Sequence, residues 1–178
     1  MRASLLTQLD QLNSELDDLF RELEQSSHEQ LNRQPAADSW SAMQVMNHLL
    51  LSEMYSRQYC EKKLSFAPEL PTTGISDRLR TLIVRFFFWL PFRINAPKFI
   101  ATDALPKESE LETVRTSYLE QRQAMAKFLS SVDDQYLNKA VYKHPFVGRL
   151  SLAGMLRFFG AHFRHHRKQL RRAIQAAK

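Results

Sequence analysis

The chain has 178 residues, which is enough for one domain with a proper core and too few for two, so we expect a single domain over residues 1–178. Its hydrophobic content of 44% and charged content of 25% match an ordinary soluble protein. The single cysteine, Cys60, excludes an internal disulfide and fits a reducing compartment.

Neither a secretory signal nor a membrane span is expected. The first twenty residues carry acidic side chains throughout and have no unbroken apolar segment, which indicates a cytoplasmic protein. The most lipid-like stretch, residues 82–92, has about half the length that a bilayer-spanning helix needs. It also contains Arg85 and Pro91. We therefore expect no membrane insertion.

Two helices are predicted in the first third of the chain. Apolar residues recur every three or four positions from Leu5 to Leu23, which is typical of a helix that buries one face. A second helix is expected over residues 41–64, because Ser41 and Gln44 have the spacing of a capping box at its start. Trp40, just before that start, is interpreted as a packing residue.

A third, shorter helix is predicted in the middle of the chain. Residues 65–74 hold two prolines and a glycine and are expected to form a loop. The helix then runs from residue 76 or 77 to residue 90, where Pro91 ends it. Its aromatic run at residues 86–89 packs in the core, caps the bundle, lines a pocket or meets a second subunit.

The remaining helices are predicted over residues 109–129 and 151–176. A loop is expected between them at residues 133–148, with Gly148 supplying a turn conformation. With no convincing strand, the pattern predicts an all-α fold of the up-and-down bundle type, with a long connection and an extra short helix in the middle.

The charge is unevenly distributed along the chain. No acidic residue follows Asp134, whereas ten basic residues do, and the first helix is acidic. One interpretation is that the acidic first helix and the basic last helix pack side by side. The other is a surface for nucleic acid or another anionic ligand. The lack of interleaved exposed aromatic residues argues against a single-strand binder, so nucleic acid is not the expected partner.

Three histidines in the sequence HFRHHR raise the question of a metal site in the last helix. The apolar stripe of this helix passes through His162 and His166, so both imidazoles face the core one turn apart. This spacing suits two ligands of one zinc or nickel ion, at nitrogen distances of roughly 2 Å. His165 falls about 100° away on the charged side and is expected to be solvated. His48, on a mixed stripe of the second helix, is the candidate for a third ligand.

A family resemblance points to the same three histidines. The segments WSAMQVMNHLLLSE (residues 40–53) and HPFVGRLSLAGMLRFFGAHFRHHRKQL (residues 144–170) resemble the DinB/YfiT-like superfamily. The resemblance implies a four-helix bundle that binds one divalent ion, nickel or zinc, through histidines at the positions of His48, His162 and His166. It further implies a homodimer and, in some members, transfer reactions that use a low-molecular-weight thiol.

Further candidates lie near these ligands in the sequence. Ser52 and Tyr55 are near the His48 face and could donate hydrogen bonds to a bound ligand. His144 either orients a ligand from the loop or is held by its own backbone. Glu53 lies about 140° from His48 around the helix, which favours a surface or inter-helix ion pair over a general base. Cys60 is interpreted as a small core residue.

Two functions from different classes remain open on the sequence. The first is a metal-dependent enzyme, of the thiol S-transferase or hydrolase type, that activates a thiol or water against a small molecule. The second is a non-catalytic, stress-related binding protein that uses its basic C-terminal helix to contact an acidic ligand or partner. The metal-dependent enzyme is the primary prediction and the binding protein is the alternative, while nothing in the sequence decides whether the ion activates a thiol or water.

Overall fold

The structure of the chain is a computed structural model that describes residues 1–37, 39–74, 105–144 and 148–177. Its elements, in chain order, are α1 (Arg2–Leu23), α2 (His28–Asn32), α3 (Ala42–Leu64), α5 (Leu111–Ser131), the 3-10 helix η3 (Asp134–Tyr136), β1 (Tyr142–His144), β2 (Gly148–Leu150) and α6 (Leu152–Ala176). The fold is all-α, as predicted, with a single small hairpin among the described residues. None of its described helices is both long and apolar enough to cross a membrane.

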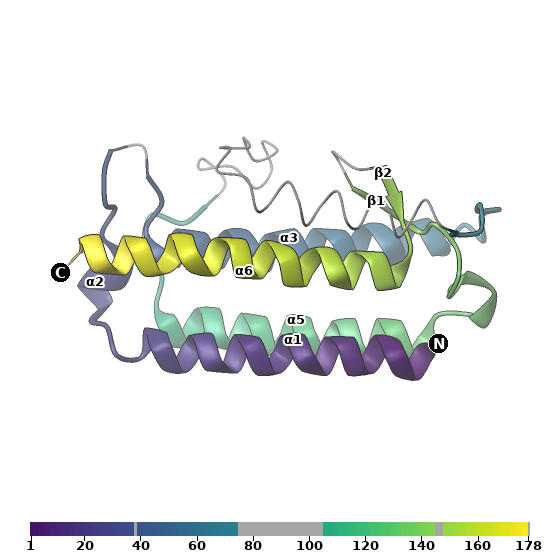
Figure 1. The fold of residues 1–178 in the computed structure, drawn as a ribbon, viewed down its shortest axis with the longest axis horizontal. Coiled ribbons are helices and arrows are strands. Elements are labelled where there is room, and N and C mark those ends of the chain that lie inside the picture. Colours follow the sequence, from purple (N-terminus) through teal and green to yellow (C-terminus); the bar gives the residue numbers. More distant parts are fainter. Residues whose placement is uncertain (38, 75–104, 145–147, 178) are drawn as a thin grey trace.

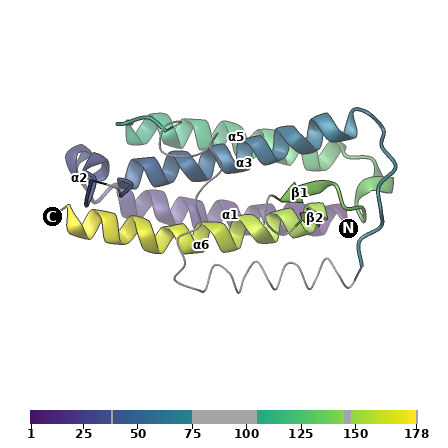
Figure 2. The same ribbon diagram turned by 90° about the horizontal axis from the view of Figure 1, so that it is seen from above.

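The long helices α1, α3, α5 and α6 form a bundle in which each packs against two others (Figure 1). Helix α3 contacts α5 and α6, and α1 contacts the same two helices (Figure 2). Helices α1 and α6 run in one direction, and α3 and α5 run in the other.

The parallel pair α3 and α5 explains the long connection predicted in the middle of the chain. Helix α3 has 23 residues and is therefore about 35 Å long. Because α5 begins beside the start of α3, the end of α3 and the start of α5 lie at opposite ends of the bundle. The short helix predicted within this connection, and the aromatic run at residues 86–89, lie outside the described residues.

The predicted boundaries are confirmed to within two residues for α3, α5 and α6, whereas α1 starts three residues before the apolar stripe that predicted it. The predicted capping box is present: the Ser41 hydroxyl accepts from the Gln44 backbone N–H at 3.1 Å, and the Gln44 side chain accepts from the Ser41 N–H at 3.0 Å. Ser151 caps α6 by accepting from the Gly154 N–H at 2.9 Å.

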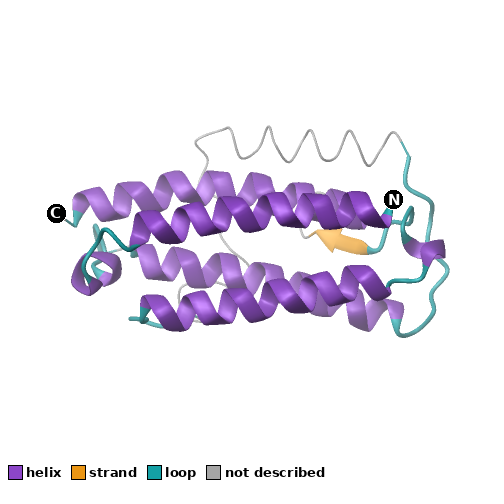
Figure 3. Ribbon diagram, turned by 90° about the horizontal axis from the view of Figure 1, so that it is seen from below, coloured by secondary structure: helices purple, strands orange, loops and turns teal. Residues whose placement is uncertain are grey.

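Four short elements were not predicted: the helix α2, the 3-10 helix η3 and the strands β1 and β2. Helix α2 is short but starts with a capping box of its own, formed by Ser27 and Gln30. The expectation that the chain has no strand is wrong, because β1 and β2 pair antiparallel, with Tyr142 opposite Leu150. Figure 3 shows strand structure in orange beside the helices. Gly148 starts β2 at φ 78°, the turn conformation predicted for it.

Two apolar clusters fill the bundle, one near the hairpin and one near α2. A polar layer lies between them along the helices. Glu53 of α3 and Arg122 of α5 form a buried ion pair there at 2.9 Å, and Arg122 also donates to the Asn13 side chain of α1 at 3.3 Å. The inter-helix ion pair predicted for Glu53 is thus confirmed, but the pair is in the core and not on the surface.

The charges of α1 and α6 neutralise one another, which confirms the side-by-side interpretation. The Arg164 guanidinium lies 2.7 Å from the Glu15 carboxylate. Two turns further along α1, the Glu22 carboxylate pairs with Arg167 and, at 2.8 Å, with Arg171. These three arginines of α6 therefore form ion pairs within the chain.

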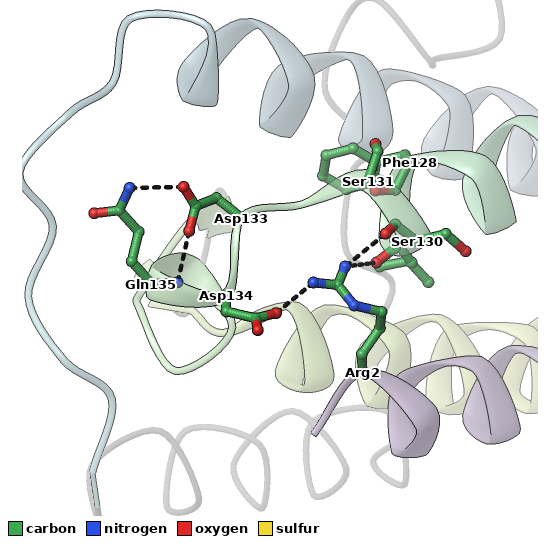
Figure 4. Close-up of polar contacts among 8 residues, drawn as sticks. Arg2, Phe128, Ser130, Ser131, Asp133, Asp134 and Gln135 are labelled. Atoms are coloured by element: carbon green, nitrogen blue, oxygen red, sulfur yellow. Dashed lines mark hydrogen bonds and ion pairs between the residues drawn. The ribbon is translucent and has the colours of Figure 1, made fainter.

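Arg2, the first residue of α1, caps the C-terminal end of α5 (Figure 4). The Arg2 guanidinium donates to the backbone carbonyls of Leu129 at 3.2 Å and Ser130 at 2.6 Å, and it also pairs with the Asp134 carboxylate. These carbonyls belong to the last turn of α5, where backbone acceptors have no partner within the helix. A cation at this end also interacts favourably with the helix dipole.

Candidate metal centre

The three histidines selected from the sequence lie together in the structure. The side chains of His48, His162 and His166 each offer one nitrogen, and these three atoms lie within 4.8 Å of one another. The Nε2 atoms of His48 and His162 are 3.3 Å apart. Among the described residues, this is the one group of histidine, cysteine or carboxylate side chains gathered closely enough to hold a metal ion.

Helix packing explains why these residues meet. His162 and His166 are one turn apart on α6, so their rings are neighbours on the face that packs against α3, with the ring planes 84° apart. The ring centroids are 4.5 Å apart. His48 projects from α3 toward the gap between them, with ring centroids 5.2 Å from His162 and 4.9 Å from His166. The ligand set therefore spans the α3–α6 seam.

The surroundings of His162 and His166 keep their two imidazoles neutral. Burial lowers the pKa of His162 well below its ordinary value, and the neighbouring rings of His166 and His48 lower it further. Burial likewise lowers the pKa of His166 to about 3, although a hydrogen bond to Gln169 acts in the opposite direction. A neutral imidazole is the form that binds a metal ion, so these two side chains are ready to do so at neutral pH.

Aromatic rings cover the outer sides of the histidines. The Trp40 ring lies 4.7 Å from that of His48 and 6.4 Å from that of His166. The Phe158 ring stacks on His162 at 5.2 Å, with 16° between the ring planes. Trp40 is therefore a packing residue, as predicted, and what it packs against is the histidine group itself.

His144 lies behind this aromatic layer and not in the histidine group. It is buried in β1, and its ring contacts Phe158 edge-on at 4.3 Å. Phe158 in turn stacks on His162, so one ring links His144 to the group. Burial lowers the pKa of His144 to about 4. Both interpretations of His144, that it orients a ligand or that it is held by its own backbone, stay predictions.

The other candidates fall at different distances from the group. Ser52 is buried one turn after His48 on the same face of α3, whereas the Tyr55 side chain is 38% exposed. Their proposed hydrogen bonds to a ligand stay predictions. The expectation that His165 is solvated is partly wrong, because it is half-buried with its ring 5.1 Å from that of His166.

Cys60 is a core residue, as predicted, and not part of the site. It is fully buried, and its Sγ lies 3.8 Å from the Met155 Sδ. Burial raises the pKa of its thiol, which keeps it protonated at neutral pH.

Comparison with known proteins gives the family. The family model of the DinB superfamily matches residues 8–170. The chain belongs to the DinB superfamily. A relative in Bacillus subtilis (strain 168), the uncharacterized protein YuaE, is 26% identical over 158 residues, which cover 85% of this chain and 88% of the relative. No solved structure gives a significant match to the chain.

The residues present in this DinB-superfamily protein fit a divalent metal ion. The group consists of imidazoles alone, with no carboxylate among its members. Imidazole nitrogens suit zinc, nickel, copper or iron and are poor ligands for magnesium or calcium, which prefer oxygen. Burial and the lowered pKa values of His162 and His166 meet the further need for unprotonated ligands. The histidine group is thus compatible with metal binding.

One residue of the site was missed in the sequence. The Gln169 side chain approaches the His166 ring, with 2.8 Å between Oε1 and Nδ1. Its spacing of three residues from His166 on one helix was a usable signal, because residues three apart are neighbours on a helix surface.

Proposed function

We propose that this DinB-superfamily protein binds one divalent ion, nickel or zinc, through His48, His162 and His166. We further propose that it uses the ion to act on a small-molecule electrophile. The observation that carries this proposal is the convergence of three ring nitrogens within 4.8 Å from two helices. Two histidines one turn apart on a helix can occur by chance. Such chance would not explain why a third histidine, from another helix, lies beside them.

The donor set supports a catalytic ion over a structural one. Three protein ligands leave at least one coordination position open, whereas structural zinc sites use four. Neutral imidazoles also leave the ion its full double charge. When bound, such an ion lowers the pKa of a water or thiol and so supplies a nucleophile near neutral pH.

The surrounding residues have separate tasks in this proposal. Trp40 and Phe158 cover the rings of the ligands and limit the access of water to them. Ser52 is the nearest hydroxyl along α3, one turn from His48, and donates a hydrogen bond to the bound substrate or thiol. Tyr55, one turn beyond Ser52 and partly exposed, contacts the substrate from the solvent side.

The resemblance to the superfamily supports thiol transfer as the reaction class, with a low-molecular-weight thiol as the second ligand and a homodimer as the assembly. Hydrolysis by an activated water uses the same open position. The rival function, a non-catalytic protein that binds through a basic last helix, has less support. Arg164, Arg167 and Arg171 already pair with carboxylates of α1.

Elemental analysis of protein purified without a histidine tag tests the proposal. We expect one nickel or zinc ion per chain in the wild-type protein, and loss of the ion in His48→Ala and His162→Ala variants that retain the helical circular-dichroism spectrum. His165→Ala, in the same helix but outside the group, is the matched control and keeps the ion. Absence of metal after reconstitution with nickel or zinc at neutral pH would overturn the proposal.

A further inference from the structure

We infer that Gln169 is a positioning residue that selects the ring nitrogen through which His166 binds a metal ion. The inference rests on the proposed function insofar as the bound group is a metal. The underlying hydrogen bond, however, is a property of the chain alone. It concerns a residue that is not itself a ligand.

The contact fixes where the proton of His166 lies. The Gln169 Oε1 is 2.8 Å from the Nδ1 of His166. An amide oxygen can only accept a hydrogen bond, so Nδ1 must carry the proton. In a neutral imidazole the other nitrogen, Nε2, then has the free lone pair. Gln169 thus holds His166 in the tautomer that presents Nε2.

This tautomer agrees with the geometry of the other two histidines. His48 and His162 already face each other through their Nε2 atoms at 3.3 Å. A third ligand that also presents Nε2 completes a set of like donors around one position. With the proton on Nε2 instead, His166 would direct a hydrogen toward the ion's position and would have to exchange it before binding.

His166 is the histidine of the group that most needs such a partner. His48 and His162 are buried, whereas His166 is half-buried at the C-terminal end of the group. Packing therefore restrains its ring less. A hydrogen bond from the next turn of α6 supplies the restraint in both orientation and tautomer.

An amide and a carboxylate at position 169 would differ in charge and not in geometry. A carboxylate partner raises the basicity of a ligating histidine and adds a negative charge near the ion. The neutral amide orients the ring without that charge, which leaves the ion a stronger Lewis acid. Gln169 therefore favours activation of a bound nucleophile over the tightest possible binding.

The test compares Gln169→Leu, which removes the acceptor, with Gln169→Glu, which keeps one. Gln175→Leu makes the same change at an exposed position of the same helix and is the matched control. In metal-free protein at pH 7.5, ¹⁵N NMR of the histidine rings is expected to show the Nδ1–H tautomer of His166 in the wild type, Gln169→Glu and Gln175→Leu. Gln169→Leu is expected to show a mixture of both tautomers.

Competition with a chelator for nickel or zinc gives the second readout. We expect about 10- to 100-fold weaker metal binding in Gln169→Leu, which is the usual effect of losing an outer partner of a ligand. Gln169→Glu is expected to bind at least as tightly as the wild type, and Gln175→Leu equally tightly. Equal tautomer populations in the wild type and Gln169→Leu would overturn the inference. A wild-type protein that binds no metal but shows the Nδ1–H tautomer would overturn the proposed function alone.

Discussion

Replacing Glu53 by leucine is expected to destabilise the protein far more than its single ion pair suggests. The Glu53 carboxylate and the Arg122 guanidinium are 4% and 6% exposed and lie 2.9 Å apart. Without Glu53, the guanidinium stays charged, because arginine does not lose its proton in proteins. Among the described residues, its remaining hydrogen-bond partner is the Asn13 side chain at 3.3 Å. Breaking such a pair costs about 3–5 kcal/mol of unfolding free energy.

The double variant Glu53→Leu/Arg122→Met is expected to regain most of that loss. Burial raises the pKa of Glu53 even though Arg122 lowers it, which indicates that the pair does not fully offset the cost of removing both charges from water. Replacing both charges with apolar side chains of similar size is therefore about neutral, or stabilising by about 1–4 kcal/mol.

Urea unfolding of the metal-free protein, followed by circular dichroism at pH 7, measures both effects. Asp18→Ala breaks the exposed pair between Asp18 and Arg21 and is the control, with an expected change within about 0.5 kcal/mol. The reasoning would be refuted if Glu53→Leu cost less than about 1 kcal/mol. A double variant as unstable as the sum of the two single ones would refute it equally.

Three further predictions concern the backbone, the thiol and the buried histidines. Gly148→Ala should lower the unfolding free energy by roughly 1 kcal/mol, because a residue with a side chain is strained at φ 78°. Gly148→Asn should lower it less. Equal urea midpoints for the wild type and both variants would contradict this prediction. Cys60 should resist a thiol reagent such as DTNB in the native protein and react once urea unfolds it, whereas fast native labelling would show that the α3–α6 seam is open. Metal-free protein should lose stability as the pH falls from about 7 toward 4. In the folded protein, burial lowers the pKa of His144 to about 4 and that of His166 to about 3, whereas the same histidines in the unfolded chain bind protons near pH 6.5. Acid therefore favours the unfolded state. The expected slope is about 1.4 kcal/mol per pH unit for each histidine, and urea midpoints that stay flat or rise on acidification would rule it out.

The sequence was informative where one short stretch of helix determines the outcome. Spacing alone placed His162 and His166 on the buried face of α6, and the capping box of Ser41 and Gln44 located the start of α3. The spacing of apolar residues indicates which face of a helix is buried as well as that a helix is present. The buried position of His48 was therefore predictable from the residues that share its face of the helix.

Features that depend on pairing between distant segments were harder to predict. The strands β1 and β2 have three residues each, too few for an alternating pattern to appear. Glu53 was placed correctly away from the metal-binding face, but its burial follows from Arg122, on a helix that the sequence does not align with α3. The sequence likewise allowed two roles for the basic residues of α6, and only the packing of α1 beside it decided between them.

Short local signals were also present and overlooked. Helix α2 begins with Ser27 and Gln30, the same capping-box spacing that located α3. The partner of His166 lies three residues further along the same helix. Both are within reach of sequence reasoning that examines every polar residue next to a predicted site or helix start.

The central claim is that His48, His162 and His166 hold one ion between α3 and α6. Anomalous X-ray diffraction from crystals of the nickel-loaded protein, with data collected above and below the nickel edge, tests it most directly. The account predicts one peak in the seam, about 2.0–2.1 Å from a ring nitrogen of each of the three histidines. A peak at His165 or at surface carboxylates, with no density among the three rings, would contradict it.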